Sequence, residues 1–494
     1  MRSFLFLFLL LFNESYQTII AYENSSKKLI NSNLNQDSKN KKESNSKITL
    51  EINNGNLKEI LRRNNVTLKI LESGIKQSEA LVKSSKSAWY PRLDLTSNQL
   101  PQFITGDNRN KFSDDTSTNQ LNFGIKNTIT WDLINPVRRL DINIAKRNVN
   151  KAKLAYESYL EDIYFEALKT FFEIKKLNQE TFVADEALRV AKFAYEEAQN
   201  RYQAGIGNKM EVLEANFQLG RDEIFLDQVI GSLEIKKNYL KKLLNLKDDF
   251  FIRENLDFPL VGFWPYEYEE SLNGALESRK ILDIKRNEIL INKDQAKSIL
   301  AQKRPLISLY NSYSLSTSKG ESNVLNPNLN NIIKNNENIL GVKLNLKLID
   351  GGKINQEYNA ILLKDQELES DLDNEILTLK NDLKDNIINL KINKKKIKTH
   401  FYQLKAAKES LKISIKRLKA GITTQREVVN LQRDVKEAET NYINSIAQYN
   451  IIIGKLRTLT GYKEMKYCNE NNYEKKDPDK FIKFLKNNNL INCI

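Results

Sequence analysis

Residues 201–213 read RYQAGIGNKMEVL, and residues 417–429 read RLKAGITTQREVV. The two stretches share several residues at one constant separation, so the chain carries the same motif twice. The shared residues are Arg201, Ala204, Gly205, Ile206, Glu211 and Val212 in the first copy and Arg417, Ala420, Gly421, Ile422, Glu427 and Val428 in the second. A motif repeated at this distance indicates that a larger unit has been duplicated.

The sequences that precede the two motifs also match, and in the same order. WYPRLDLTS (89–97) corresponds to KRPLISLYN (303–311), and TWDLINPVRR (130–139) corresponds to NLKLIDGGKI (345–354). Chance similarity between helices would not keep this register over so long a distance. We therefore expect a first repeat at 48–247, an inter-repeat linker at 248–269 and a second repeat at 270–461.

Each repeat predicts a shorter helix, a pair of strands, a very long helix and a helix that returns after a glycine turn. The expected helices before the turns are 55–88 and 137–204 in the first repeat and 270–302 and 353–420 in the second. The shorter helices end close to Pro91 or Pro305, because proline cannot continue a helix. The longer helices contain neither proline nor glycine and would reach roughly 100 Å at 1.5 Å per residue. Apolar or small residues recur in them every three or four positions, which is typical of a coiled coil.

The strand candidates alternate between apolar and polar residues. LNFGIKNTITWDL (121–133) places Phe123, Ile125 and Trp131 on one face and asparagine, lysine and threonine on the other. The counterpart at 340–348 alternates in the same way, and the partner strands at 93–103 and 306–316 do so more loosely. A membrane strand needs about 9–11 residues, so these lengths are sufficient. One apolar face and one polar face are what a water-filled membrane barrel requires.

The number of strands bears on oligomeric state. An open sheet does not persist in a bilayer, because each unpaired edge group costs several kcal/mol there. Two strands per repeat give each chain too few strands to close a useful barrel alone. If these strands cross a membrane, several chains must therefore contribute to one barrel.

The ends of the chain predict export. Residues 1–21 begin with Arg2 and an unbroken apolar run at 4–12, which has the length of a signal-peptide core and is too short to span a bilayer. A polar, disordered linker is expected at 22–47. Residues 462–494 form a basic tail that holds both cysteines, Cys468 and Cys493, and an oxidising compartment would allow these to form a disulfide.

Composition argues against catalysis, a bound cofactor, a metal site and a nucleic-acid partner. The formal net charge is +14, but the charged residues are spread along the helices with acids among the bases. The single histidine, His400, lies within a long helix among lysines, and the cysteines lack metal-site spacing. No glycine-rich phosphate loop is present.

Taken together, these motifs resemble the TolC family of outer-membrane efflux proteins. The resemblance covers roughly 48–461 and rests on ITLEINNGNLKEILRRNNVTL (48–68), YPRLDL (90–95), LIDGGK (348–353) and the two R-x-x-A-G-I-x-x-x-x-E-V turns. It implies an α+β membrane protein of the cell outer membrane. Its fold would be a homotrimeric β-barrel with four strands per subunit, set in outer-membrane lipid and continued through the periplasm by an α-helical coiled-coil barrel. Its partners would be a periplasmic adaptor and an inner-membrane pump of RND or ABC type, in efflux or type I secretion.

The resemblance also assigns site residues. Gly205, Ile206, Gly421 and Ile422 would form the periplasmic tip that docks the adaptor, and Glu211, Glu214 and Glu427 would be lumen acids at the tunnel entrance. The sequence departs from the family where Thr423 replaces a basic residue that helps to latch the entrance, and where Asn135-Pro136-Val137 ends the first strand pair. The rival interpretation is a secreted or periplasmic coiled-coil structural protein or adhesin, which would account for the helices but not for the duplicated strands.

Overall fold

The computed structural model describes residues 50–108, 116–247, 250–252, 260–322 and 332–462. The expected signal peptide, the polar linker and the tail beyond Tyr462, with Cys468 and Cys493, lie outside the described residues. The chain divides into two compact units. The smaller is centred on β1 (Leu50–Ile52) and β4 (Phe250–Ile252), which pair with each other.

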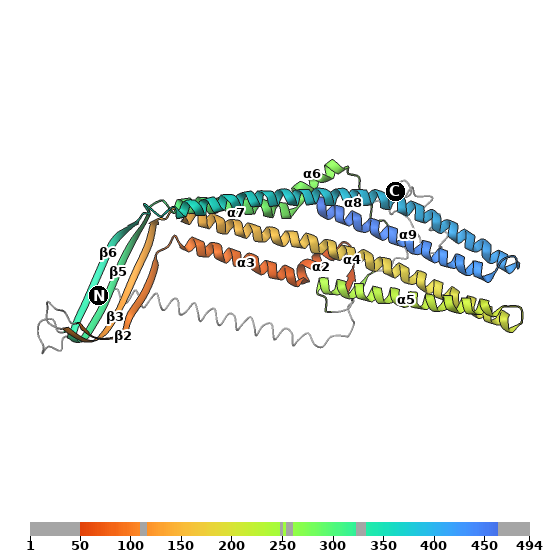
Figure 1. The fold of residues 1–494 in the computed structure, drawn as a ribbon, viewed down its shortest axis with the longest axis horizontal. Coiled ribbons are helices and arrows are strands. Elements are labelled where there is room, and N and C mark those ends of the chain that lie inside the picture. Colours follow the sequence, from red (N-terminus) through yellow and green to blue (C-terminus); the bar gives the residue numbers. More distant parts are fainter. Residues whose placement is uncertain (1–49, 109–115, 248–249, 253–259, 323–331, 463–494) are drawn as a thin grey trace. The chain divides into compact units, whose positions relative to one another are not determined.

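The larger unit contains the same series of elements twice (Figure 1). The first series is α2 (Leu57–Asn64), α3 (Val66–Ser87), β2 (Arg92–Asn108), β3 (Thr116–Ile134), α4 (Arg138–Gln203) and α5 (Lys209–Leu244). The second is α6 (Tyr268–Ser278), α7 (Lys280–Ala301), β5 (Leu306–Ser322), β6 (Ile332–Asn345), α8 (Lys353–Lys419) and α9 (Gln425–Thr460). The expected mixture of strands and very long helices, and its internal repeat, are confirmed.

The shorter helix of each repeat is divided in two, which the sequence pattern did not predict. Asn65 is extended (ψ 127°) between α2 and α3, and Arg279 is extended (ψ 112°) between α6 and α7. The Asn65 side chain accepts a hydrogen bond from the Leu68 amide at 3.0 Å and donates one to the Leu243 carbonyl at 2.9 Å. Asparagine is a preferred helix cap, so it ends one helix and starts the next at the same residue.

Four strands form one antiparallel sheet in the order β2-β3-β5-β6. All four begin or end beyond the alternating stretches that identified them. Strand β6 begins earlier than expected, but at its C-terminal end it stops at Asn345 rather than at the expected residue 348. Asn345 pairs with Leu306, the first residue of β5, and the preceding Pro305 has no N–H to extend the ladder.

Apolar side chains on this sheet are exposed, and several polar ones are buried. Phe123, Ile125 and Trp131 of β3 are 45, 45 and 40 % exposed, whereas Asn122 is 6 % exposed. The edge strands expose further large apolar side chains, among them Leu93, Leu95 and Phe103 of β2 and Leu340, Val342 and Leu344 of β6. The sheet thus carries many large apolar side chains that its own copy leaves exposed, and exposed apolar patches mark sites of contact with membrane or protein.

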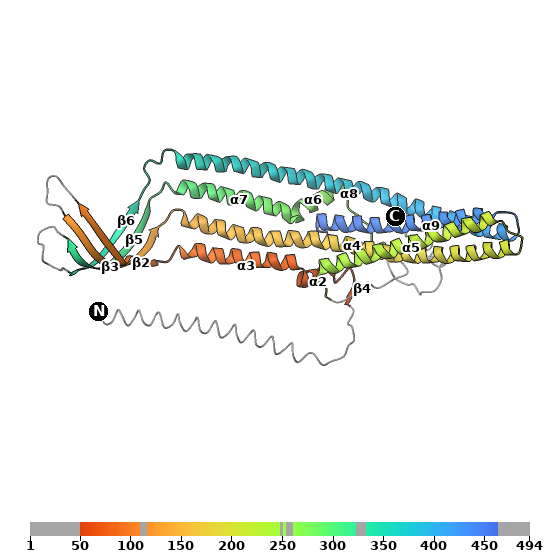
Figure 2. The same ribbon diagram turned by 60° about the horizontal axis from the view of Figure 1, so that its bottom comes forward.

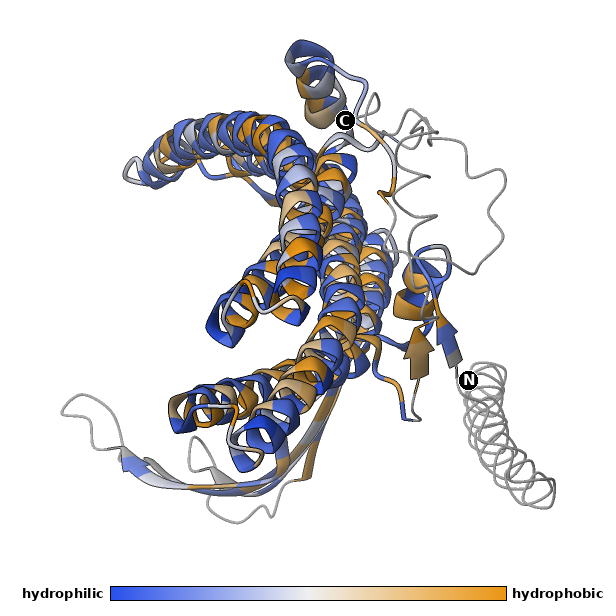
Figure 3. Cartoon of the chain, turned by 90° about the vertical axis from the view of Figure 1, so that its right-hand side faces the viewer, coloured by the Kyte–Doolittle hydropathy of each residue, from blue (hydrophilic) through white to orange (hydrophobic). Residues whose placement is uncertain are grey.

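The helices of the larger unit pack side by side around α4. Helix α4 contacts α3, α5, α7 and α9, and α8 contacts α7 and α9; α3, α4, α7 and α8 can be followed as neighbours in Figure 2. Apolar residues recur between polar ones along the long helices, as Figure 3 shows. The core between α4 and α9 includes Leu168 and Gly454, where an added Cβ would lie only 2.8 Å from the Leu168 side chain. Glycine thus allows these two helices to approach closely.

In the part of the chain that the structure describes, no helix has both the length and the apolar character needed to cross a membrane.

Candidate functional site

The two repeated turns join the long helices at one end of the helical region (Figure 1). Gly205 and Gly421 adopt left-handed conformations, with φ of 75° and 71°. After each glycine the isoleucine amide donates back into the helix, from Ile206 to the Arg201 carbonyl at 3.1 Å and from Ile422 to the Arg417 carbonyl at 2.9 Å. The left-handed region is unfavourable for residues that have a Cβ, so the shared glycine follows from the shared turn.

The side chain that follows each glycine is apolar and exposed. Ile206 is 73 % exposed and Ile422 is 67 % exposed, although neither belongs to a core within this chain. The returning helices start directly afterwards, capped by Asn208, which accepts from the Met210 amide at 3.0 Å, and by Thr424, which accepts from the Glu427 amide at 3.4 Å. Each tip therefore combines a rigid turn with one protruding isoleucine.

The expected entrance acids lie near the starts of the returning helices, Glu211 and Glu427 in the first turn and Glu214 one turn further on, and they differ in their surroundings. Glu427 accepts a hydrogen bond from the Thr423 hydroxyl and another from the Ser414 hydroxyl at 3.3 Å. The Thr423 hydrogen bond is the main cause that lowers the pKa of Glu427 below its ordinary value, and the Arg417 guanidinium, 4.0 Å away, acts in the same direction. Thr423, which stands where a basic residue was expected, thus holds Glu427 in its charged form.

Glu214 is part of an ion pair. The Arg426 guanidinium donates to both of its carboxylate oxygens, with Nε 3.1 Å from Oε2. Glu211 lies one turn nearer the tip and is half-buried. The structure therefore brings Glu214 together with a base of the second repeat, which leaves Glu211 and Glu427 as the acids not engaged across the hairpins.

A second contact between the repeats was not identified from the sequence. Asp222 of α5 and Lys436 of α9 form an ion pair at 2.5 Å, and their side chains are only 5 and 15 % exposed. Gln218 also donates to Asp222 at 2.7 Å, and the Lys436 ammonium lies 4.8 Å from the centre of the Phe225 ring. Only a weak indication of this pair is present in the sequence. Asp222 and Lys436 follow their own glycine turns at similar distances, but nothing in either repeat identifies one as the partner of the other.

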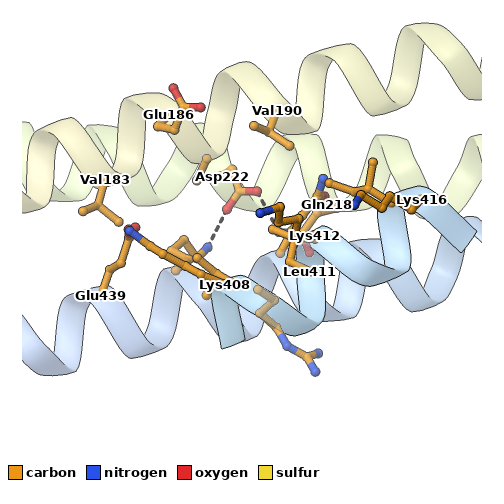
Figure 4. A pocket seen from close by; sticks show the side chains of 16 residues that line it. Val183, Glu186, Val190, Gln218, Asp222, Lys408, Leu411, Lys412, Lys416 and Glu439 are labelled. Atoms are coloured by element: carbon orange, nitrogen blue, oxygen red, sulfur yellow. Dashed lines mark hydrogen bonds and ion pairs between the residues drawn. The ribbon is translucent and has the colours of Figure 1, made fainter. Parts of the chain in front are cut away.

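A cavity of about 520 Å³ lies beside this pair, between the two long hairpins. Figure 4 shows Val183 and Val190 of α4 on one side and Leu411 and Lys412 of α8 on the other. Lys408, at its wall, is paired with Glu439 at 2.6 Å. The described residues include no group of histidine, cysteine and acidic side chains that could hold a metal ion. The chemistry available here is ion pairing and apolar contact between helices.

The comparisons with known proteins agree with this architecture. The family model for "Outer membrane efflux protein" matches residues 57–246 and 275–462, one match in each repeat. The CmeC outer membrane channel of Campylobacter jejuni superposes with a TM-score of 0.67 at 15 % identity, over 88 % of this chain and 89 % of that chain. VceC, an outer membrane protein of Vibrio cholerae, gives 0.64 at 15 % identity over 83 and 96 %. The open state of the MtrE outer membrane channel of Neisseria gonorrhoeae gives 0.62 at 14 % identity over 83 and 88 %.

The search of curated proteins gave no match. At these identities the solved structures establish a shared fold, whereas the family model covers most of the described chain in two segments. The resemblance drawn from the sequence motifs is confirmed, and the family consists of channels rather than enzymes. The chain belongs to the outer membrane efflux protein family, and it is an efflux channel protein of the outer membrane.

Proposed function

We propose that three copies of this chain form a duct that carries substrates from an inner-membrane pump and its periplasmic adaptor through the outer membrane. Both edges of the four-stranded sheet support this assembly. Within the described residues β2 pairs only with β3, and β6 pairs only with β5. In a trimer, β6 of each copy would pair with β2 of the next and close a barrel of twelve strands. Closing the barrel gives the backbone N–H and C=O groups of the edge strands hydrogen-bond partners, which lipid cannot supply.

The observation that carries the proposal is the exposed apolar face of this sheet. In β6, Leu340, Val342 and Leu344 are 71, 66 and 64 % exposed, and they alternate with Gly341 and Lys343. Lipid is the solvent in which such a face is stable. The alternating polar side chains would then line a water-filled passage.

The junction between strands and helices has the chemistry of a membrane boundary. Trp89 and Tyr90 are 53 and 73 % exposed there. The Trp131 indole donates to the Trp89 carbonyl at 3.0 Å, and the Arg138 guanidinium lies 4.3 Å from the centre of the Trp89 ring. Aromatic residues are enriched where hydrocarbon meets water. These contacts support a membrane boundary at the ends of the strands. The helices would then lie in the periplasm, beyond that boundary.

The tips and their acids complete the proposal. Ile206 and Ile422, one at each of the two tips of a copy, would give a ring of six protruding apolar side chains in the trimer for the adaptor to contact. Glu211, Glu214 and Glu427 would surround the entrance, with Glu214 neutralised by Arg426. The pump that such a duct serves would be of RND or ABC type.

The test uses opposite faces of one strand. Leu340→Arg with Val342→Arg places charge on the face assigned to lipid, at a cost of about 2–4 kcal/mol per residue near the bilayer midplane. The matched control is Lys343→Arg, which keeps its charge on the other face. The double variant should leave the outer-membrane fraction and lose the discrete conductance steps that the parent and control give in planar bilayers. Normal fractionation and conductance of the double variant would refute the lipid-facing assignment.

A further inference from the structure

Helix α5 has an apolar row that no described residue of its own chain covers. Five large apolar residues recur along it at helical spacing: Met210, Leu213, Phe217, Ile224 and Ile235. They are 55 to 69 % exposed. At about 100° per residue they fall on one face, roughly opposite Asp222, which points toward α9. Such a row is typical of a helix that packs against another helix.

An acidic row lies beside the apolar row of α5. Glu223, Asp227 and Glu234 are exposed and fall about 80° round the helix from the apolar residues. Glu234 is paired with Lys237 at 3.0 Å. Glu223 and Asp227 form no ion pair or hydrogen bond with another described residue through their side chains. These two acids are therefore available to a partner.

Helix α8 carries a row of the opposite charge. Six exposed lysines recur at every seventh residue: Lys384, Lys391, Lys398, Lys405, Lys412 and Lys419, of which Lys412 also lines the cavity between the hairpins of its own copy. None of them is joined to another residue of the described chain by an ion pair or hydrogen bond. Seven-residue spacing keeps a set of side chains on one face of a coiled-coil helix. This row lies about 80° round α8 from its own exposed apolar residues, Ile388, Ile392, Tyr402 and Ile413.

The order of the helices places these two surfaces at opposite edges of one copy. α4 contacts both α5 and α9, α9 packs against α8, and α5 reaches α9 through the Glu214–Arg426 and Asp222–Lys436 pairs. The strands follow the same order, because β2 at one edge of the sheet follows α3 and β6 at the other edge leads into α8. If edges join in a trimer, each α8 comes to lie beside α5 of the next copy. The inference therefore rests on the proposed function.

The two helices also match in level. α8 ends at its tip with Lys419, and α5 leaves its tip at Lys209, so the pair would be antiparallel. Lys405 and Glu223 are equally far from these ends (419 − 405 and 223 − 209 are both 14), and Asp227 is level with the space between Lys398 and Lys405. Counted in the same way from the helix ends, Phe217 would lie at about the level of Ile413, and Ile224 at about the level of Tyr402.

The two charged rows also fall on the same side of the contact. When each helix is viewed along its own chain direction, the charged row is rotated from the apolar row in the same sense. The two helices of an antiparallel pair run in opposite directions, so when both are viewed from one common end the two rotations have opposite senses. When the apolar rows face each other, the lysines and acids are therefore adjacent.

We propose that α5 of one copy packs against α8 of the next, with the apolar rows at the centre and Lys398 and Lys405 paired with Glu223 and Asp227. The lysines of one face repel one another until a partner supplies acids, so this contact favours the assembled trimer. It also makes the trimer sensitive to salt, since exposed charges are screened over about 8 Å at physiological ionic strength.

The test is a charge swap in the full-length protein, read as the temperature at which the detergent-solubilised trimer dissociates. Lys398→Glu with Lys405→Glu should lower it, as should Glu223→Lys with Asp227→Lys. The four changes together should restore most of the loss. The control is Lys396→Glu, an exposed lysine of α8 outside the row, which should change little. High salt should lower the parent's dissociation temperature and leave that of the double variants nearly unchanged.

Three outcomes separate the possibilities. If the parent protein is not a trimer, the proposed function itself fails, and this result does not depend on the charge-swap variants. If the parent is a trimer but the swap does not restore stability, the α5–α8 pairing is wrong. If the lysine variants keep full trimer stability and lose export, the lysine row serves an acidic partner protein instead, and the proposal is overturned.

Discussion

The Arg426 guanidinium of α9 binds the carboxylate of Glu214 of α5, with Nε 3.1 Å from Oε2. This pair joins the first turn of α9 to the second turn of α5, and therefore the two repeats, close to both tips. Its effect on the entrance is electrostatic as well as mechanical. Arg426 compensates the charge of Glu214 closely, whereas Arg417 approaches Glu427 only to 4.0 Å, so Glu427 and Glu211 are the acids expected to attract cations.

Replacing Glu427 by Gln should reduce the cation preference of the channel. Three copies of this acid around a narrow entrance would favour cations over anions. The reversal potential in a salt gradient across a planar bilayer measures this preference. Glu214→Gln serves as the control, and it should change selectivity less because Arg426 already neutralises Glu214. Equal effects of the two variants would show that the ion pair does not persist in the assembled channel.

The same preference should persist to lower pH than an ordinary glutamate would allow. The Thr423 hydroxyl lowers the pKa of Glu427, so the carboxylate stays charged below the ordinary titration range of glutamate. Any stability that this acid contributes is present above its unfolded pKa and is lost as the pH falls through the lowered folded pKa. Thr423→Val should move the loss of selectivity to higher pH in the bilayer measurement. A midpoint that does not move would mean that the hydroxyl does not bind the carboxylate in the working channel.

Breaking the buried pair between Asp222 and Lys436 should destabilise the long hairpins. Asp222→Asn leaves a buried ammonium without its counter-charge, which typically costs about 3–5 kcal/mol. Asp222→Leu with Lys436→Met removes both charges and should cost much less. Thermal unfolding followed by the helical circular-dichroism signal gives both values. A double variant that loses as much as the single one would show that packing, not charge, holds this contact.

Aspartate at both tip isoleucines should abolish export without disturbing the fold. Ile206→Asp with Ile422→Asp puts a carboxylate where an adaptor must exclude water, and an unpaired desolvated charge opposes docking. Trimer formation and bilayer conductance should be unchanged, because neither side chain is in a core. Ile206→Leu with Ile422→Leu is the matched control and should export normally. Export at the parental rate by the aspartate variant would place adaptor docking elsewhere.

Much of this fold could be predicted because glycine and proline mark its boundaries. Gly205 and Gly421 identified both turns, and both adopt the left-handed conformation that the motif requires. Pro305 likewise fixes where β5 starts. The strands were predicted too short, since residues such as Asn335, Asn336 and Asn338 give β6 no alternation of polarity to recognise. Backbone pairing with β5 extends the strand through them.

The features that sequence reasoning missed depend on contacts between distant segments. Asp222 and Lys436 come from different repeats, and neither is unusual in its own helix. From the sequence alone, the charged residues of α8 are interpreted as part of an ordinary solvated helix surface. The spacing of Lys391, Lys398 and Lys405 gains meaning only when the helix order places α8 at an edge.

The claim that edges of neighbouring copies join is tested most directly by cysteine cross-linking between β2 and β6. Within one copy β3 and β5 lie between these strands, so they are roughly 14 Å apart at about 4.8 Å per strand, too far for a disulfide. In a background with Cys468→Ser and Cys493→Ser, Leu95→Cys would be combined in turn with a cysteine at each of residues 338–344. We expect covalent dimers and trimers in one narrow register under oxidising conditions. Only monomers at every register, from folded protein recovered in the outer-membrane fraction, would refute the edge-to-edge contact.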